Sequence, residues 1–315
     1  MDLPLVYQGF SEQRRYRIGQ YIIGGLPGEN PVWLVGSIFY LGDKLLLSEK
    51  GEFDRLGASE KIEEASNIAE EYGVVFGLDV VFPSSESVDK ILPFVAEYDI
   101  PLFLDSPDPL VRAKSYRLAR EIGVNDRSIA NGVFIDSPYE EIEALRDSGI
   151  KTTVVMLFDP RKPAETLYPE NRIKLLDKLL ELARKAGIEN IIVDAIVIDP
   201  ASIAFSAETV YLVKKNYGYP SGCAPANALG PASKKSIGIE NMYGVHGGIA
   251  AYLRLHGADY IMYGPLSRIK YIAPVVSIID SLLGYSLRRK GISISGVHPL
   301  KKLFREIQKL FATSR

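Results

Sequence analysis

The hydrophobic positions of this chain gather into eight short runs, most of which are continuous rather than alternating with polar residues. Continuous apolar runs of this length are typical of strands that are buried on both faces of a parallel sheet. They predict strands over residues 32–40, 74–81, 101–105, 127–134, 152–158, 190–197, 219–225 and 258–263. An earlier stretch, residues 14–23, instead alternates polar and apolar residues around a central turn, which predicts a small hairpin.

Amphipathic segments lie between these runs, and several have recognisable end signals. The signals are Ser59 before and Gly73 after the first helix, Asp108-Pro109 at the start of the second, and a capping box from Ser137 to Glu140 with Pro138 at the first helical position. Further helices are predicted over 169–186, 202–216, 243–256, 267–290 and 299–312, with a kink at Pro274.

Eight strands that alternate with helices indicate an α/β protein and favour a (β/α)8 TIM barrel, with the short N-terminal hairpin as a plug beneath it and an extra C-terminal helix. An open doubly wound sheet stays possible, because a sequence cannot show that a sheet closes, but no glycine fingerprint supports it. We expect residues 1–23 to form an arm and hairpin, of which 1–13 are loose or depend on a partner. Residues 24–315 then form a single barrel domain.

The composition narrows the class of protein. The chain has 315 residues, 47% of them hydrophobic, which is enough for one large domain with a substantial core. A net charge of −2 argues against a nucleic-acid partner. The single cysteine, Cys223, excludes an intramolecular disulfide, and no Cys/His set has the spacing of a zinc site, so no protein-bound metal is predicted. Without a signal peptide or a long apolar run, we expect a cytoplasmic protein.

Four polar side chains fall where predicted strands end. Asp105 and Asp194 stand at the ends of apolar stretches, and Asn131 and Asn227 stand at or just after the ends of two others. In a barrel the carboxyl ends of the strands meet at one face, which carries the active site. Any one of the four could cap a helix or bind a loop amide, but together they predict a polar ring. Carboxylates and carboxamides without Lys or His suit a neutral heterocycle better than a phosphate.

Other chemically versatile residues give weaker signals. The histidines His246, His256 and His298 are too scattered for a metal site. Cys223 has the pattern of a small buried thiol. Asp79 lies inside a predicted strand, where it either faces the barrel interior or ends the strand.

Eight stretches of the sequence, in order from about residue 21 to residue 300, resemble those of a known family. They are Ile23 to Glu29, Gly36 to Lys44, Pro101 to Ser106, Asp126 to Asn131, Ile192 to Ala195, Gly218 to Gly222 with Asn227, Tyr263 to Pro265, and His298-Pro299. Through them the chain is similar to the pterin-binding corrinoid methyltransferases, and most closely to the family of the H subunit of tetrahydromethanopterin S-methyltransferase.

The resemblance implies transfer of the N5 methyl group of a methyl-tetrahydropterin, of the tetrahydromethanopterin or tetrahydrofolate type, to cob(I)amide. It implies that Asp105, Asn131 and Asp194 bind the pterin, that Asn227 lies near N5, and that Asn227 and Asp194 are catalytic. Because the chain lacks a D-x-H-x-x-G cobalamin signature, the corrinoid must be carried by a separate protein. A homodimer is a further family-level expectation, and a place at the periphery of a membrane methyltransferase complex stays open.

Two other functions remain open at this stage. The chain could be a non-catalytic subunit that only positions a corrinoid protein. It could also be a pterin transferase like dihydropteroate synthase, which handles a pyrophosphate and needs Lys and Arg near the last two strands. Arg268 and Lys270 follow the last strand but form no recognisable phosphate signature. The segment from Arg288 to Arg315, with eight Lys or Arg and one acidic residue, is either a solvated face or a docking patch.

Overall fold

Eight parallel strands close into a barrel in the computed structural model, which describes residues 7–229, 238–294 and 296–303. The strands pair in the order β10-β3-β4-β5-β6-β7-β8-β9. The barrel closes because β9 pairs in turn with β10, where Gly222 lies opposite Tyr260. Their bounds are β3 Trp33–Ile38, β4 Val75–Val81, β5 Leu102–Asp105, β6 Ser128–Val133, β7 Thr152–Met156, β8 Asn190–Asp194, β9 Ser221–Cys223 and β10 Tyr260–Pro265. The predicted TIM barrel is confirmed.

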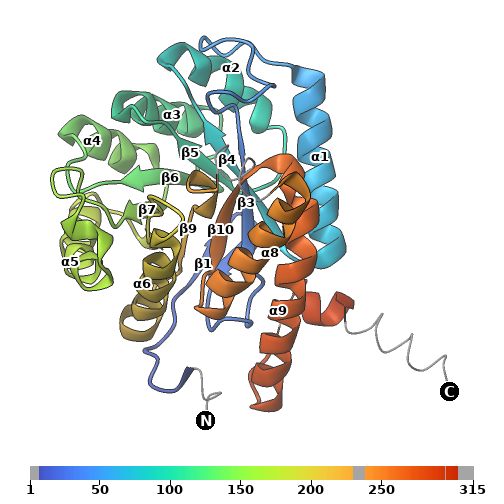
Figure 1. Ribbon diagram of the computed structural model, residues 1–315. Coiled ribbons are helices and arrows are strands. Elements are labelled where there is room, and N and C mark those ends of the chain that lie inside the picture. Colours follow the sequence, from blue (N-terminus) through green and yellow to red (C-terminus); the bar gives the residue numbers. More distant parts are fainter. Residues whose placement is uncertain (1–6, 230–237, 295, 304–315) are drawn as a thin grey trace.

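Helices surround the barrel on the outside (Figure 1). They are α1 Arg55–Tyr72, α2 Ser85–Val95, α3 Pro109–Glu121, α4 Tyr139–Ser148, α5 Pro169–Lys185, α6 Ser202–Tyr217, α8 Ile239–Leu255 and α9 Ile269–Arg289, with short 3-10 turns η2 Glu165–Leu167, η3 Pro225–Asn227 and η4 Leu266–Arg268. Apolar side chains between the strands and the helices form the main core, which is why the strands read as continuous apolar runs. None of the described helices has both the length and the hydropathy needed to span a bilayer.

A second core fills the barrel interior, and the N-terminal hairpin closes its lower end. The hairpin consists of β1 (Arg15–Ile18) and β2 (Tyr21–Gly24), which pair in antiparallel fashion. Its buried Ile18 and Ile23 pack with interior side chains such as Trp33 and Phe103. The indole N–H of Trp33 also donates to the carbonyl oxygen of Ile22 at 3.0 Å. The hairpin is therefore the plug that the sequence predicted.

Two features of the helix ends differ from expectation. The cap of α1 is Asp54, which accepts from the Gly57 N–H at 3.0 Å, while Ser59 lies within the helix. The capping box predicted at 137–140 does not form, because Pro138 takes the N-cap position of α4 without a side-chain bond. A capping box instead opens α2, a helix that the sequence analysis did not predict, through Ser84 and Ser87.

The end of the chain is described only in part. Residues 299–303 are helical, and the rest of the helix predicted over 299–312 lies outside the described residues. Much of the basic segment from Arg288 to Arg315 lies outside them as well. Pro274 lies inside α9.

The described part of the N-terminal arm, residues 7–13, is not loose. Tyr7 is buried against Leu26 and Leu287, and Phe10 packs on the same cluster. The backbone N–H of Ser11 donates to the carbonyl oxygen at the end of α6. The sequence prediction was wrong here because most of these contacts come from segments far away in the chain, such as α6 and α9, which periodicity within the arm cannot reveal.

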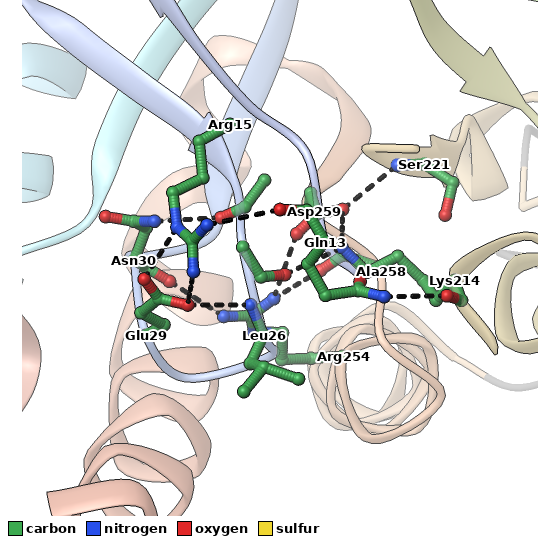
Figure 2. Close-up of polar contacts among 12 residues, drawn as sticks. Gln13, Arg15, Leu26, Glu29, Asn30, Lys214, Ser221, Arg254, Ala258 and Asp259 are labelled. Carbon is green, nitrogen blue, oxygen red and sulfur yellow. Dashed lines mark hydrogen bonds and ion pairs between the residues drawn. The ribbon is translucent and has the colours of Figure 1, made fainter. Parts of the chain in front are cut away.

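A buried ion-pair network joins α6, α8 and α9 at the lower end of the barrel, and Gln13 of this arm bonds to its main chain (Figure 2). The ammonium of Lys214 donates to Asp259 Oδ2 at 2.8 Å, and Arg254 Nε donates to Asp280 Oδ1 at 2.5 Å. Gln13 donates to the carbonyl oxygen of Lys214 at 2.8 Å. All four charged residues are at most 4% exposed, so each charge depends on its partner to offset the cost of burial.

Candidate functional site

A pocket of about 380 Å³ lies at the carboxyl ends of the strands, opposite the hairpin. Each barrel strand, or the turn that directly follows it, supplies a side chain to its wall. These residues are Ser37 from β3, Asp79 from β4, Asp105 from β5, Asn131 from β6, Met156 from β7, Asp194 from β8, Ala224 and Asn227 after β9, and Met262 from β10. The structure thus brings all four of the predicted site residues to one pocket.

Asp194 is held in place by two hydrogen bonds. The hydroxyl of Tyr260 donates to Oδ2 at 2.5 Å, and the backbone N–H of Ile196 donates to Oδ1 at 2.7 Å. Ile196 has a φ of 46°, an unfavourable conformation for a β-branched residue that costs on the order of 1–3 kcal/mol. The turn after β8 therefore adopts a strained geometry in which its backbone supports the carboxylate.

Gly222 of β9 lets the ring of Tyr260 reach that carboxylate. In the register of the sheet, Asp194 lies opposite Gly222, and Gly222 lies opposite Tyr260. A Cβ at position 222 would lie 2.1 Å from the Tyr260 carbonyl oxygen and 2.6 Å from its ring. Only glycine fits there, so the absence of a side chain on the strand between them makes the Tyr260–Asp194 contact possible.

Asp79 and Asn131 form a second linked pair on the pocket wall. The hydroxyl of Ser37 donates to Asp79 Oδ2 at 2.7 Å, and the carboxamide of Asn131 lies 3.4 Å from Oδ1. Burial raises the pKa of Asp79 to about 6, against the opposing effect of these two hydrogen bonds. Asp79 therefore faces the site, which decides between the two placements that the sequence left open.

Asp105 lies between Asp79 and a buried arginine. Burial is the main reason that the pKa of Asp105 is raised well above its usual value, and repulsion from Asp79 adds to it. Arg112 lines the same pocket, but its guanidinium is engaged by Glu141 through contacts of 2.5 and 3.0 Å. The sequence analysis expected no basic residue at this site, and Arg112 brings one whose charge is already paired.

The electrostatics of the pocket favour a ligand rich in N–H donors. Burial also raises the pKa of Asp194 to about 6, and hydrogen bonds from Tyr260 and Ile196 oppose it. Three carboxyl groups with raised pKa values thus share one enclosed space. A ligand that donates hydrogen bonds stabilises their ionised forms, because a carboxylate has about four acceptor positions and the protein fills only some of them.

Asn227 differs from the other three predicted residues in its position. It lies in η3, directly after β9, and its side chain is exposed at the rim of the pocket. Its carboxamide makes no hydrogen bond to the part of the chain that the structure describes. A group there can reorient towards a ligand without first breaking a bond.

The residues with weaker signals lie elsewhere. Cys223 is fully buried in β9, and burial raises its thiol pKa, as expected of an inert thiol. His256 ends α8 and contacts the carbonyl oxygen of Tyr252 at 2.8 Å. His246 and His298 are buried far apart in the chain. Within the described residues, no group of His, Cys, Asp and Glu side chains is arranged to hold a metal ion.

Sequence reasoning identified the acidic residues of the pocket wall better than the residues that contact and position them. Asp79 gave the same signal as Asp105 and Asp194, a lone carboxylate in an apolar run, and could have been added on that ground. Tyr260 and Arg112 gave no signal, because their roles depend on closure of the barrel and on a partner in the next helix.

Comparison with known proteins gives a consistent family. A sequence model described as the tetrahydromethanopterin S-methyltransferase MtrH subunit matches residues 11–295. The H subunit of tetrahydromethanopterin S-methyltransferase from Methanopyrus kandleri is 30% identical over 307 residues, which cover 89% of this chain and 93% of that protein. The H subunit of a putative methyltransferase, mtx, from Methanosarcina barkeri is 30% identical over 305 residues, which cover 93% and 98%.

The similar solved structures support the fold alone. A dihydropteroate synthase from Yersinia pestis with a pterine-sulfa conjugate superposes with a TM-score of 0.59 at 13% identity, covering 86% of this chain and 98% of that one. The enzyme from Xanthomonas albilineans in complex with 7,8-dihydropteroate has a TM-score of 0.58 at 14% identity and covers 85% and 98%.

Proposed function

This chain belongs to the tetrahydromethanopterin S-methyltransferase MtrH subunit family, as its motifs indicated, and from that premise we propose which reaction it performs. The chain moves the N5 methyl group of a methyl-tetrahydropterin to cob(I)amide on a separate corrinoid protein. The pterin is of the tetrahydromethanopterin or tetrahydrofolate type.

The observation that carries the proposal is the acidic wall of the pocket. A reduced pterin presents an exocyclic amine and adjacent ring N–H groups, which are hydrogen-bond donors that pair with carboxylates. Asp194 and Asp105 accept from these donors, and Asn131 supplies both a donor and an acceptor for the pyrimidine carbonyl and ring nitrogen. Asp79 adds a third acidic group beside Asn131. Arg112, the cation among the described lining residues, is paired with Glu141, which suits a ring that donates hydrogen bonds.

The chemical step needs a proton more than a protein nucleophile. Cobalt(I) in the corrinoid supplies the electron pair that forms the new bond to the methyl carbon. The electron pair of the broken C–N bond stays on N5, which must gain a proton or a strong hydrogen bond. Asn227 at the rim is placed to orient towards N5, in the way that preorganised polar groups stabilise developing charge. Asp194 assists by fixing the ring, because the N–H donors of the ring stabilise its ionised form.

The mouth of the pocket suits a protein partner. Apolar side chains between 46% and 72% exposed occupy the loops or helix starts that follow five of the strands. They are Leu41, Leu110, Tyr139, Tyr168 and Ile198. Exposed apolar groups around a pocket typically mark an interaction surface. We assign this rim to the corrinoid protein, which must bring its cobalt to the pterin.

The assembly we propose is a cytoplasmic homodimer of barrels. In each subunit the barrel spans 24–315 and follows the arm and hairpin 1–23.

Methyl transfer to free cob(I)alamin tests the proposal. The protein is incubated with methyl-tetrahydromethanopterin or methyl-tetrahydrofolate, and the spectral change from cob(I)alamin to methylcobalamin is followed. We expect turnover with at least one donor. Folded protein that transfers no methyl group from either donor, yet binds a corrinoid protein, is instead a non-catalytic positioning subunit.

A further inference from the structure

A second, smaller pocket lies beside the first at the same end of the barrel. It has a volume of about 210 Å³ and is formed by the turn after β10, the start of α9 and the facing side of α8. Its wall contains two cationic side chains, Arg268 and Lys270, together with His246. The stacked rings of Tyr243 and Tyr271, with centroids 3.6 Å apart, form one side.

The described residues supply no carboxylate partner to the two cations of this pocket. Arg268 makes one long contact, 3.4 Å from Nη1 to the carbonyl oxygen of Tyr263, and the groups that act on its charge are phenols rather than carboxylates. Lys270 lies over the ring of Tyr271, 5.2 Å from its centroid. Across the described residues, no Asp or Glu pairs with either cation. The buried arginines Arg112 and Arg254, by contrast, each have a carboxylate partner.

His246 adds a neutral hydrogen-bond donor. His246 is 6% exposed, and its imidazole has no hydrogen-bond partner among the described residues. Burial lowers its pKa to about 4, so the ring is neutral and keeps one N–H to donate. Two cations and an unpartnered imidazole form a site for an oxyanion.

The two pockets meet at Gly264. A Cβ at this position would lie 2.9 Å from the Cβ of Ala226 and 3.2 Å from Nη1 of Arg268. Ala226 lines the larger pocket and Arg268 lines the smaller one. Gly264 therefore lies where the walls of the two pockets pack against each other, which makes the pockets immediate neighbours.

We propose that the pocket of Arg268, Lys270 and His246 binds the anionic tail of the pterin substrate, through a carboxylate or phosphate oxygen, while the pterin ring occupies the acidic pocket. This inference rests on the proposed function for the identity of the ligand. The division of charge supports it, because the ring donates hydrogen bonds to carboxylates and the tail of a folate or methanopterin carries negative charge.

A comparison of ligands with and without the tail tests the assignment. Affinities are measured by titration calorimetry for methyl-tetrahydrofolate and for 6-methyl-tetrahydropterin, which has the ring alone. Arg268→Gln should weaken binding of methyl-tetrahydrofolate by about tenfold, since a charge-assisted contact at a half-buried site is lost. It should leave the affinity for the ring unchanged. Lys270→Gln, at an exposed position, should act in the same direction without risk to the fold.

Arg289→Gln is the matched control, because Arg289 is exposed at the opposite end of the same helix and changes the net charge equally. Equal loss of both ligands in the Arg268 and Lys270 variants would overturn the tail assignment. A loss seen only in the KM for the corrinoid acceptor would also overturn it, since the anion bound would then be the corrinoid's phosphodiester.

Inorganic phosphate separates failure of this inference from failure of the proposed function. If neither pterin binds the wild-type protein but phosphate does, and Arg268→Gln abolishes phosphate binding, the anion site stands and the pterin assignment fails. If phosphate binds the wild-type and Arg268→Gln proteins equally, or binds neither, the anion site itself is refuted.

Discussion

Replacement of Asp194 by Asn separates binding of the pterin from stability of the fold. The two side chains have nearly the same shape, so the packing around the pocket is kept. The carboxamide can still accept the Ile196 N–H, but its amide nitrogen then faces Tyr260, whose hydroxyl now donates to Oδ2 at 2.5 Å. One charge-assisted hydrogen bond is lost, together with a buried negative charge.

The change should not lower the stability of the fold. Burial raises the pKa of Asp194 from 3.8 to about 6 even against the hydrogen bonds from Tyr260 and Ile196, so its ionised form costs about 3 kcal/mol of folding free energy at pH 7. Asn removes this cost, and its amide nitrogen can donate to the hydroxyl oxygen of Tyr260. The variant should therefore be at least as stable as the wild-type protein. Binding should still weaken, because two N–H donors of the ring lose their carboxylate, which corresponds to about 100-fold or more in affinity.

The assay pairs titration calorimetry with 6-methyl-tetrahydropterin and thermal unfolding followed by circular dichroism. Asp259→Asn is the matched control, because Asp259 is an equally buried aspartate at the opposite end of the barrel. It should keep its pterin affinity but lose about 3–5 kcal/mol of stability, since Lys214 is left without its partner. The reasoning is refuted if Asp194→Asn binds the ring as tightly as the wild-type protein does, or if it unfolds as readily as Asp259→Asn.

Three further predictions concern the same pocket. Asn227→Ala should lower kcat for methyl transfer by about 10²–10³-fold with little change in KM, because it acts mainly as the C–N bond breaks; an altered KM at constant kcat would show that it only binds. Gly222→Ala should lower the free energy of unfolding by about 3 kcal/mol and weaken pterin binding, because the new Cβ meets the backbone oxygen of Tyr260; denaturant unfolding checks this, and unchanged stability would contradict the contact. Affinity for the ring should fall about tenfold between pH 7 and pH 5, because Asp79 and Asp194 take up protons around their raised pKa values of about 6 and then accept fewer hydrogen bonds. In the unliganded protein the same protonation should raise stability over that range, since the folded state binds these protons more tightly than the unfolded state does, and calorimetry across pH would expose the opposite sign.

Strand positions were readable from the sequence because barrel strands are buried on both faces. The eight runs matched the eight strands, and Asp105, Asn131 and Asp194 followed from their place at strand ends. Local periodicity is enough for this, since each strand carries its own burial pattern.

The remaining features depend on contacts between distant segments. Tyr260 supports Asp194 only because the barrel closes and because Gly222 on the strand between them has no side chain. Arg112 is paired by a glutamate from the next helix, and Tyr7 is buried by helices near the other end of the chain. Helix caps were also missed where two serines compete with a nearby aspartate or proline, because cap choice depends on the turn that precedes the helix.

The position of a bound pterin tests the central claim most directly. A crystal structure of the protein with methyl-tetrahydrofolate should place the ring in the pocket at the carboxyl ends of the strands, with its exocyclic amine within hydrogen-bond distance of Asp105 or Asp194. Another large pocket, of about 420 Å³, lies beside the hairpin at the opposite end and is lined by Tyr21, Phe76 and Val297. A ring bound there would contradict the proposed pterin site. So would a ring in the pocket at the carboxyl ends of the strands that contacts neither carboxylate.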